Sequence, residues 1–329
     1  MSTLAHDASL DGTPAGTDVA ASRVTAGLVF ALVSAISFGM SGALARGLIE
    51  TGWSPGAMTL VRVALAAGAL TPFGLVALRG RWGLLRRNLG LLAAYGAIAV
   101  VGAQFCYFSA VQHMQVGPAI LIEFTAPAVV VVYLWLRHAQ RPGRMTLAGA
   151  GLAALGLVLV LDLVSGASLS VPGVLWALGA MVGCATYFII SADEDNGLPP
   201  LVLAWAGLVV GALGLAVLAV VGLLPMRAST ASTSYADVDV AWWVPLLVLG
   251  LVTAALAYVA GIAAGRRLGS RLASFVALLE VVASVFWAWL LLHELPGAVQ
   301  LLGGILILAG VVAVKLGERS VVTREPAPA

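Results

Sequence analysis

The stretch ILIEFTAPAVVVVYLW, residues 120–135, places one carboxylate, Glu123, within an apolar run long enough to cross much of a lipid bilayer. A charged side chain at mid-span costs roughly 2.5 to 3.5 kcal/mol on insertion scales, so it is rarely left facing lipid. The stretch therefore predicts a membrane-spanning helix in which Glu123 faces a protein partner or a water-filled cavity.

The rest of the 329-residue chain has the same character, since 61% of its residues are hydrophobic and only 10% are charged. No soluble protein of this length could bury so much apolar surface. Spanning segments must be helices or a closed barrel, and these continuous apolar windows lack the alternation of barrel strands. We predict an all-α integral membrane protein with ten transmembrane helices, each near the ~20 residues needed to span. The predicted spans are 25–45, 57–78, 89–109, 116–136, 146–164, 172–191, 200–222, 243–264, 272–292 and 298–316.

Basic residues gather in alternate loops between these spans. If the amino terminus is cytoplasmic, only Arg46 and Arg227 fall on the opposite side, and Arg62 lies within a span. The positive-inside bias then predicts a multi-pass protein of the plasma (inner) membrane with both termini cytoplasmic. The basic residues on the predicted cytoplasmic side are Arg23, Arg79, Arg81, Arg86, Arg87, Arg137, Arg141, Arg144, Arg266, Arg267, Arg271, Lys315, Arg319 and Arg324.

The second half of the chain repeats the first. A shift of 154 positions aligns Trp135 with Trp289 and Pro142 with Pro296, so the third to fifth spans recur as the eighth to tenth. Five is an odd number, so the second half must enter the membrane from the opposite side, which predicts two inverted five-helix repeats. Such repeats bind substrates near the bilayer midplane at their interface. The same shift also aligns three pairs of glycines: Gly96 with Gly250, Gly149 with Gly303 and Gly156 with Gly310.

These patterns divide the chain into two repeats and two tails. Residues 25–164 form the first predicted repeat and residues 172–316 the second. Residues 1–24 are rich in small and polar residues and are predicted to be a disordered cytoplasmic tail, as are residues 317–329.

Only three charges are predicted to lie well inside the spans: Arg62, Glu123 and Glu280. Under the 154-residue shift Glu280 aligns with Ala126, one helical turn after Glu123, so both repeats place a carboxylate on the equivalent helix face. Two interpretations stay open. Arg62 and Glu123 could form a structural ion pair, or the acids could line a substrate and proton route. We favour the second for both acids, with Glu280 as the titrating proton site and Glu123 as a fixed charge facing a substrate amine.

Further candidates for the binding site are polar or aromatic residues at mid-span. Gln104 and Tyr258 are aligned by the 154-residue shift, so each repeat contributes a hydrogen-bonding group at the same depth. The alternative for each is ordinary hydrogen bonding between helices, which averages about 0.6 kcal/mol. The lesser candidates are Tyr107, Thr125, Tyr133 and Tyr187.

Several other classes of function are not supported. The four histidines stand far apart, without the spacing of a metal site. No glycine-rich phosphate loop precedes Lys315, so ATP is not the expected energy source, and no catalytic constellation indicates an enzyme. We expect no cofactor and no nucleic-acid partner, because the basic loops are explained by membrane topology. The segment GAGLAA, residues 149–154, fits a dinucleotide motif by chance, and its glycines are expected to serve close helix packing instead.

The segment GRRLGSRLASFVALLEVVASVFWAWLLLHELPGAVQLLGGILILAG, residues 265–310, resembles the second repeat of the EamA family of drug/metabolite transporters. In that family a Glu-Pro in the ninth helix and a Gly-Glu at its end are typical, and Glu280 and Glu294 match the two acids. Val281 replaces the proline and His293 the glycine. Arg62 matches an arginine common in the family's second helix.

The segment VQHMQVGPAILIEFTAPAVV, residues 111–130, is similar to the threonine/homoserine exporter branch of that family. The resemblance implies a ten-helix fold, a central cavity and export of small metabolites. We expect a secondary active exporter of neutral amino acids such as threonine and homoserine, driven by protons or by exchange, with alternating access. A multidrug or lipophilic cation exporter of the same superfamily is the alternative, and a passive channel or a scaffold stays open. The expected partners are the substrate, protons and lipid, and a homodimer is left open.

Overall fold

The computed structural model describes residues 15–126, 129, 143–160, 170–192, 196–261, 263–264, 267–268 and 278–322. These residues are mostly helical, as the sequence predicts. The helices are α1 (Ala15–Glu50), α2 (Pro55–Leu78), α3 (Trp82–Arg87), α4 (Leu89–Ala94), η1 (Tyr95–Gly102), α5 (Ala103–His113), α6 (Val116–Glu123), α8 (Arg144–Val160), α9 (Val171–Ala192), α10 (Pro200–Val220), α11 (Trp243–Leu247), η2 (Val248–Leu256), α13 (Leu279–Leu292) and α14 (Ala298–Val322). The strands are β1 (Thr233–Tyr235) and β2 (Val238–Val240).

The membrane-spanning character of the chain is confirmed. Within the described ranges, six helical segments are long and apolar enough to cross a membrane, and three shorter apolar helices accompany them. The count of ten spans stays a prediction, because the predicted spans 116–136 and 272–292 are described only in part. The six long segments are Thr25–Glu50, Pro55–Leu78, Leu89–His113, Val171–Ser191, Pro200–Val220 and Trp243–Gly261.

Local sequence explains where two of these helices start and stop. Ser54 caps α2, because its hydroxyl accepts a hydrogen bond from the Ala57 amide, and Pro55 occupies the first turn, where its missing N–H costs nothing. At the end of α13, His293 adopts the left-handed conformation with φ 56°. Glycine is the usual residue in that conformation. The histidine therefore closes the helix in the position where the EamA pattern carries glycine.

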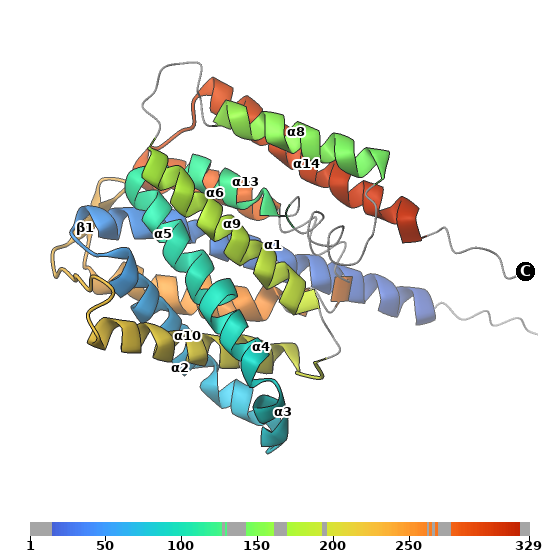
Figure 1. The fold of residues 1–329 in the computed structure, drawn as a ribbon, viewed down its shortest axis with the longest axis horizontal. Coiled ribbons are helices and arrows are strands. Elements are labelled where there is room, and N and C mark those ends of the chain that lie inside the picture. The colour runs from blue at the N-terminus through green and yellow to red at the C-terminus, as the bar shows by residue number, and fades with distance from the viewer. Residues whose placement is uncertain are drawn as a thin grey trace, which may run out of the picture.

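Helix α1 packs mainly against α13 and η2, and a short hairpin of β1 and β2 lies at one end of the bundle (Figure 1). The two strands pair antiparallel, with Ser234 opposite Asp239. We call this the hairpin end. The amino end of α1 and the carboxyl end of α14 both lie at the opposite end (Figure 1). The hairpin occupies the loop between the predicted spans 200–222 and 243–264 and was not predicted.

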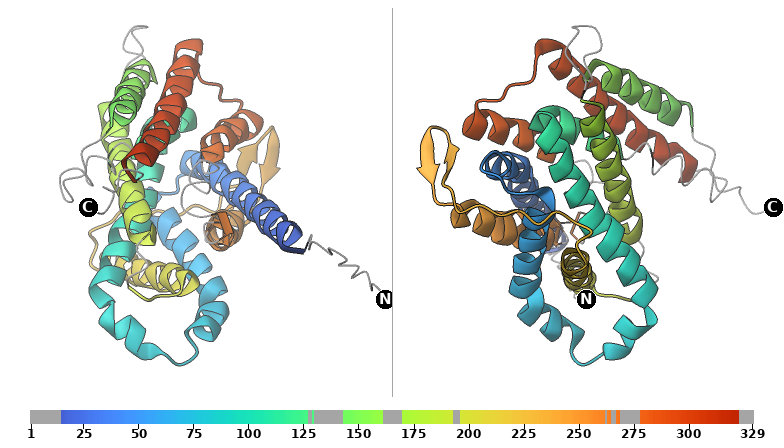
Figure 2. Two further views of the ribbon diagram at one scale, coloured as in Figure 1. Left: turned by 90° about the vertical axis from the view of Figure 1, so that its right-hand side faces the viewer. Right: turned by 60° about the vertical axis from the view of Figure 1, so that its left-hand side comes forward.

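Helices α8 and α14 lie side by side along one flank of the molecule in all views (Figures 1 and 2). A Cβ added to Gly156 would lie 2.6 Å from the Gly303 carbonyl oxygen, and one added to Gly310 would lie 2.5 Å from that of Gly149. The predicted use of glycines for close packing is therefore confirmed for Gly149, Gly156, Gly303 and Gly310, and is wrong for Gly151, since no described residue lies within 4 Å of a Cβ there. Because Gly149 faces Gly310 while Gly156 faces Gly303, the two helices run antiparallel.

Two π-helical segments widen the helical turns at equivalent positions of the two halves. The segment η1 spans Tyr95–Gly102 and η2 spans Val248–Leu256, which is the range expected from the 154-residue shift to within one residue. Such widened turns are rare and are often found at functional sites. Each one directly precedes the helical turn that carries Gln104 or Tyr258, so both repeats place their polar mid-span residue next to a widened turn.

Candidate functional site

Arg62 is the centre of the candidate site. It projects from α2 and is only 3% exposed. Its Nη2 donates a hydrogen bond of 2.7 Å to the Thr253 carbonyl oxygen, which belongs to the widened segment η2. Its guanidinium carbon lies 5.3 Å from the centre of the Phe108 ring, in cation–π geometry. Arg62 Nε has no hydrogen-bond partner among the described residues, so one donor of this buried cation is left over.

The two predicted acids lie around this arginine. Glu123 is the last residue of α6, Glu280 lies in the first turn of α13, and both side chains are half-buried. Each acid interacts electrostatically with Arg62, and Glu280 also interacts with Glu123. Neither acid forms an ion pair with Arg62 among the described residues, where such pairs are found only near the hairpin end. Arg62 is therefore a cation shared at a distance between two carboxylates.

Gln104 and Tyr258, the polar residues aligned by the repeat, touch each other. Gln104 Nε2 donates a hydrogen bond of 3.2 Å to the Tyr258 hydroxyl. The Tyr258 ring meets the edges of Phe38 and Tyr187, with ring centres 5.2 Å and 6.1 Å away. The Tyr258 hydroxyl also interacts electrostatically with Arg62, so this aromatic group borders the charged one.

Of the lesser candidates, the structure places two at the border of the site. Tyr187 packs on Tyr258, and Tyr107 interacts electrostatically with Arg62 and both acids, so both border the site. The Thr125 hydroxyl is occupied locally, because it donates to the Ile122 carbonyl oxygen at 2.7 Å and also lies 2.9 Å from Met181 Sδ. Tyr133 lies outside the described residues.

Sequence reasoning missed several neighbours of the site. Phe108 follows Gln104 by four residues and Ser284 follows Glu280 by four, so helical spacing alone could have placed both on the faces that carry the predicted residues. Thr253 contributes a backbone carbonyl, which no side-chain pattern could indicate.

A second polar cluster lies at the hairpin end. Glu294 accepts a hydrogen bond of 3.2 Å from the Val116 amide and lies 3.8 Å from Arg46 Nε. Arg46 also pairs with Glu50 at 3.0 Å and donates to the Val111 carbonyl oxygen at 2.7 Å. Burial raises the pKa of Glu294, although the Arg46 charge and the Val116 N–H favour its ionised form. The cluster joins α1, the turn between α5 and α6, and the turn between α13 and α14.

The chemistry available at the central site is polar binding. Arg62 offers a cation with a spare donor, Glu123 and Glu280 offer carboxylates, and Tyr258 with Tyr187 offers aromatic surface. No group of three or more metal-ligating side chains occurs in the part of the chain that the structure describes. The arrangement suits a small molecule that carries both signs of charge.

Comparison with known proteins agrees with this architecture. Residues 25–162 and 171–316 match the EamA-like transporter family as two successive repeats. The chain is similar to the threonine/homoserine exporter RhtA of Salmonella typhimurium strains SL1344 and LT2, with 28% identity over 305 residues, 91% of this chain and 93% of the relative. A solved crystal structure with 21% identity shares the fold, with a TM-score of 0.58 over 89% of this chain and 98% of its own. The chain therefore belongs to the EamA-like transporter family.

Proposed function

We propose that this protein is a secondary active exporter of small zwitterionic metabolites, with neutral amino acids such as threonine and homoserine as its substrates. The observation that carries the proposal is the buried Arg62, whose Nε has no hydrogen-bond partner among the described residues and whose charge lies within electrostatic range of two carboxylates. A buried charge that lacks full pairing is costly, and a ligand that completes the pairing recovers that cost. The similarity to RhtA supports amino acids as the class.

Each charged group has a proposed role in this mechanism. Arg62 holds the substrate carboxylate, since a guanidinium is always charged and presents a planar fork that matches a carboxylate. Glu123 faces the substrate ammonium group. Glu280 takes up and releases the coupling proton, because an acid near the middle of a membrane protein is a common part of proton routes.

The proposed transport cycle is alternating access between two halves of opposite orientation. Two observations support this inversion: Gln104 meets its repeat partner Tyr258, and the glycines of α8 face those of α14 in antiparallel order. Contacts between equivalent positions are expected where the two halves are related by a two-fold axis in the membrane plane. By the distribution of basic residues, the hairpin end faces outside and both termini lie in the cytoplasm.

The test is transport in proteoliposomes loaded with labelled threonine. We expect counterflow with the parent protein and a stimulation by an imposed proton gradient. Glu280→Gln should abolish the gradient effect while exchange of labelled substrate continues, and Glu123→Gln should weaken binding of amine-bearing substrates. Glu50→Gln is the matched control, because that glutamate is 60% exposed at the hairpin end. Unchanged gradient dependence in Glu280→Gln would refute the proton role.

A second function is favoured by one observation. The Tyr258 ring makes T-shaped contacts with Phe38 and Tyr187, and both tyrosines lie within electrostatic range of Glu280. Aromatic faces next to a carboxylate also bind lipophilic cations. The alternative is therefore a multidrug or lipophilic cation exporter. Competition separates the two, because a cation dye that displaces labelled threonine no better than a neutral dye excludes a cation site. Threonine that fails to exchange at all, while cation dyes are transported, would favour the alternative.

A further inference from the structure

Helix α1 packs at backbone distance against both halves of the bundle through two glycines. A Cβ at Gly39 would lie 2.8 Å from the Ser284 amide nitrogen and 2.8 Å from the Ala283 Cβ, both on α13. A Cβ at Gly42 would collide with the Tyr107 hydroxyl of α5 and lie 2.7 Å from Val116 Cγ1 of α6. Neither position has room for a methyl group. We call Gly39, Gly42, Tyr107 and Ser284 the seam.

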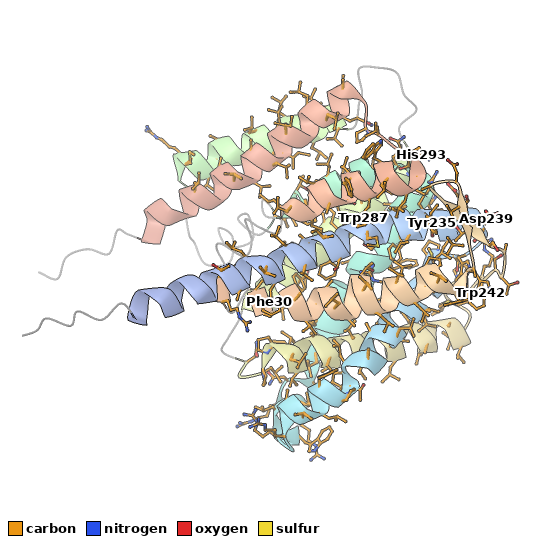
Figure 3. The ribbon with its side chains drawn as sticks, turned by 180° about the vertical axis from the view of Figure 1, so that it is seen from behind. Phe30, Tyr235, Asp239, Trp242, Trp287 and His293 are labelled. Carbon is orange, nitrogen blue, oxygen red and sulfur yellow. The ribbon has the colours of Figure 1, made fainter. Side chains whose placement is uncertain are left out.

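The seam lies between the candidate site and the hairpin end. On α5, Tyr107 is one turn beyond Gln104 in the direction of the hairpin end, and on α13, Ser284 is one turn beyond Glu280 in the same direction. The labelled residues Tyr235 and His293 mark that end of the bundle in Figure 3. A solute that leaves the site along these helices toward the hairpin must separate the seam.

Two hydroxyl groups in the seam form no hydrogen bond of good geometry with any described residue. The Tyr107 hydroxyl and Ser284 Oγ are buried, and they lie near enough to interact but outside the geometry of a hydrogen bond. Neither has a hydrogen-bond partner in the described ranges. A buried hydroxyl without a partner destabilises the closed arrangement, because water would satisfy it when the helices separate.

We propose that the seam is the gate at the hairpin end and that its two orphan hydroxyls keep the closed state only marginally stable. The glycines favour closure, since they allow α1 to approach α5, α6 and α13. The hydroxyls oppose closure, since they gain hydrogen bonds to water only in the open state. The gate opens because these two effects nearly cancel. This assigns residues to one gate of the transport cycle and does not depend on which substrate is carried.

The test measures how often the seam opens. In a background with Cys106 and Cys184 replaced by serine, Ser284→Cys places a thiol in the seam with little change of size. Because this change also removes one of the two orphan hydroxyls, every labelling rate is compared with this same parent protein. A membrane-impermeant maleimide added to right-side-out or inside-out vesicles then reports exposure from either side. We expect labelling only from the side of the hairpin end.

A substitution that hinders closure and one that removes an orphan hydroxyl should change this labelling rate in opposite directions. Gly39→Ala should raise it about tenfold, because the backbone of α13 cannot move away from the added methyl as a side chain can. Tyr107→Phe should lower it about tenfold by removing one orphan hydroxyl. The matched control is Gly68→Ala on α2, since none of the described residues lies within 4 Å of a Cβ at that glycine.

The proposal is wrong if Gly39→Ala labels no faster than Gly68→Ala, or if Tyr107→Phe labels as fast as the parent. Tyr107→Phe is decisive by itself should Gly39→Ala fail to fold, since it only removes an oxygen atom. Because labelling needs no substrate, a negative result here is distinct from a failure of the proposed amino-acid transport.

Discussion

Gln104 and Tyr258 occupy the same position in the two repeats, and Gln104 Nε2 donates a hydrogen bond of 3.2 Å to the Tyr258 hydroxyl. Two equivalent residues can touch only where the helices that carry them pass close to the axis that relates the repeats. The widened segments η1 and η2 precede them at matching positions, and Arg62 bonds to the backbone of η2. The candidate site therefore lies at the centre of the internal symmetry, where the two halves would move against each other.

A double-mutant cycle tests whether this contact stabilises the fold. Gln104→Met and Tyr258→Phe each remove the hydrogen bond, so their effects on the free energy of unfolding should not add. We expect a coupling energy of about 1 kcal/mol. The control pair is Ser109→Ala with Tyr258→Phe, because the Ser109 hydroxyl bonds within its own helix to the Phe105 carbonyl oxygen. Thermal unfolding in detergent measures the parent and the five variants. If the losses in the free energy of unfolding add in the Gln104 cycle as they do in the Ser109 cycle, the contact contributes nothing to stability.

Arg62 should not be replaceable by lysine. Lysine keeps the charge but loses the planar fork that reaches the Thr253 carbonyl while leaving another donor for a ligand. We expect Arg62→Lys to weaken threonine binding by about ten- to a hundredfold, the loss expected for one charge-assisted hydrogen bond. Arg86→Lys is the control, since Arg86 is exposed outside the predicted spans. Isothermal titration with threonine measures the difference, and equal affinity for the two variants would contradict the role of Arg62.

Much of this site was predictable because charge in hydrocarbon is rare. Arg62, Glu123 and Glu280 were identified by their cost in lipid, and the structure brings all three into electrostatic range. The 154-residue shift identified Gln104 and Tyr258 as equivalent positions of the two repeats, but it did not predict that their side chains would form a hydrogen bond.

Other features could not be predicted from the sequence because they depend on the backbone or on tertiary contacts. The π-helical segments have no residue pattern of their own. The hairpin is fixed by contacts with distant helices, since the Tyr235 hydroxyl donates to the Leu44 carbonyl oxygen at 2.6 Å and the Ala236 amide to that of Leu291 at 2.9 Å. Helical spacing could have placed Ser284 on the same face as Glu280, but its contact with Gly39 depends on how α1 packs against α13.

A side chain added to α8 should destabilise the protein only on the face of α8 that contacts α14. Gly156→Val would place its Cβ 2.6 Å from the Gly303 carbonyl oxygen, so the two helices must separate. We expect a loss of about 1 to 3 kcal/mol in the free energy of unfolding, the usual cost of overpacking. Gly151→Val on the same helix is the matched control, because a Cβ there has no neighbour within 4 Å in the part of the chain that the structure describes. If both variants unfold at the same temperature, the glycine contact is not what holds the two helices together.

The closed hairpin end should respond to pH through Glu294. Burial raises the pKa of this carboxyl group above its usual value, even though Arg46 and the Val116 amide favour the ionised form and Glu50 opposes it. If opening exposes Glu294 to water, its pKa falls toward the ordinary value, so the closed state binds the proton more tightly than the open state. Acid should therefore favour closure. The stabilisation of the closed state by the Glu294 proton is complete below the ordinary pKa range of a carboxyl group, and it is lost as the pH rises through the raised pKa of Glu294.

We expect the labelling rate of Ser284→Cys to rise with pH over this window, after division by the rate of an exposed reference thiol at Gln112→Cys, which corrects for thiol ionisation. Glu294→Gln should remove the dependence, because an amide oxygen can still accept from Val116 but cannot titrate. Glu50→Gln, on an exposed side chain of the same cluster, should leave it in place. Faster labelling in acid would contradict this prediction. It would mean that the ionised form of Glu294 stabilises the closed state, so that its pair with Arg46 outweighs the effect of burial on its pKa.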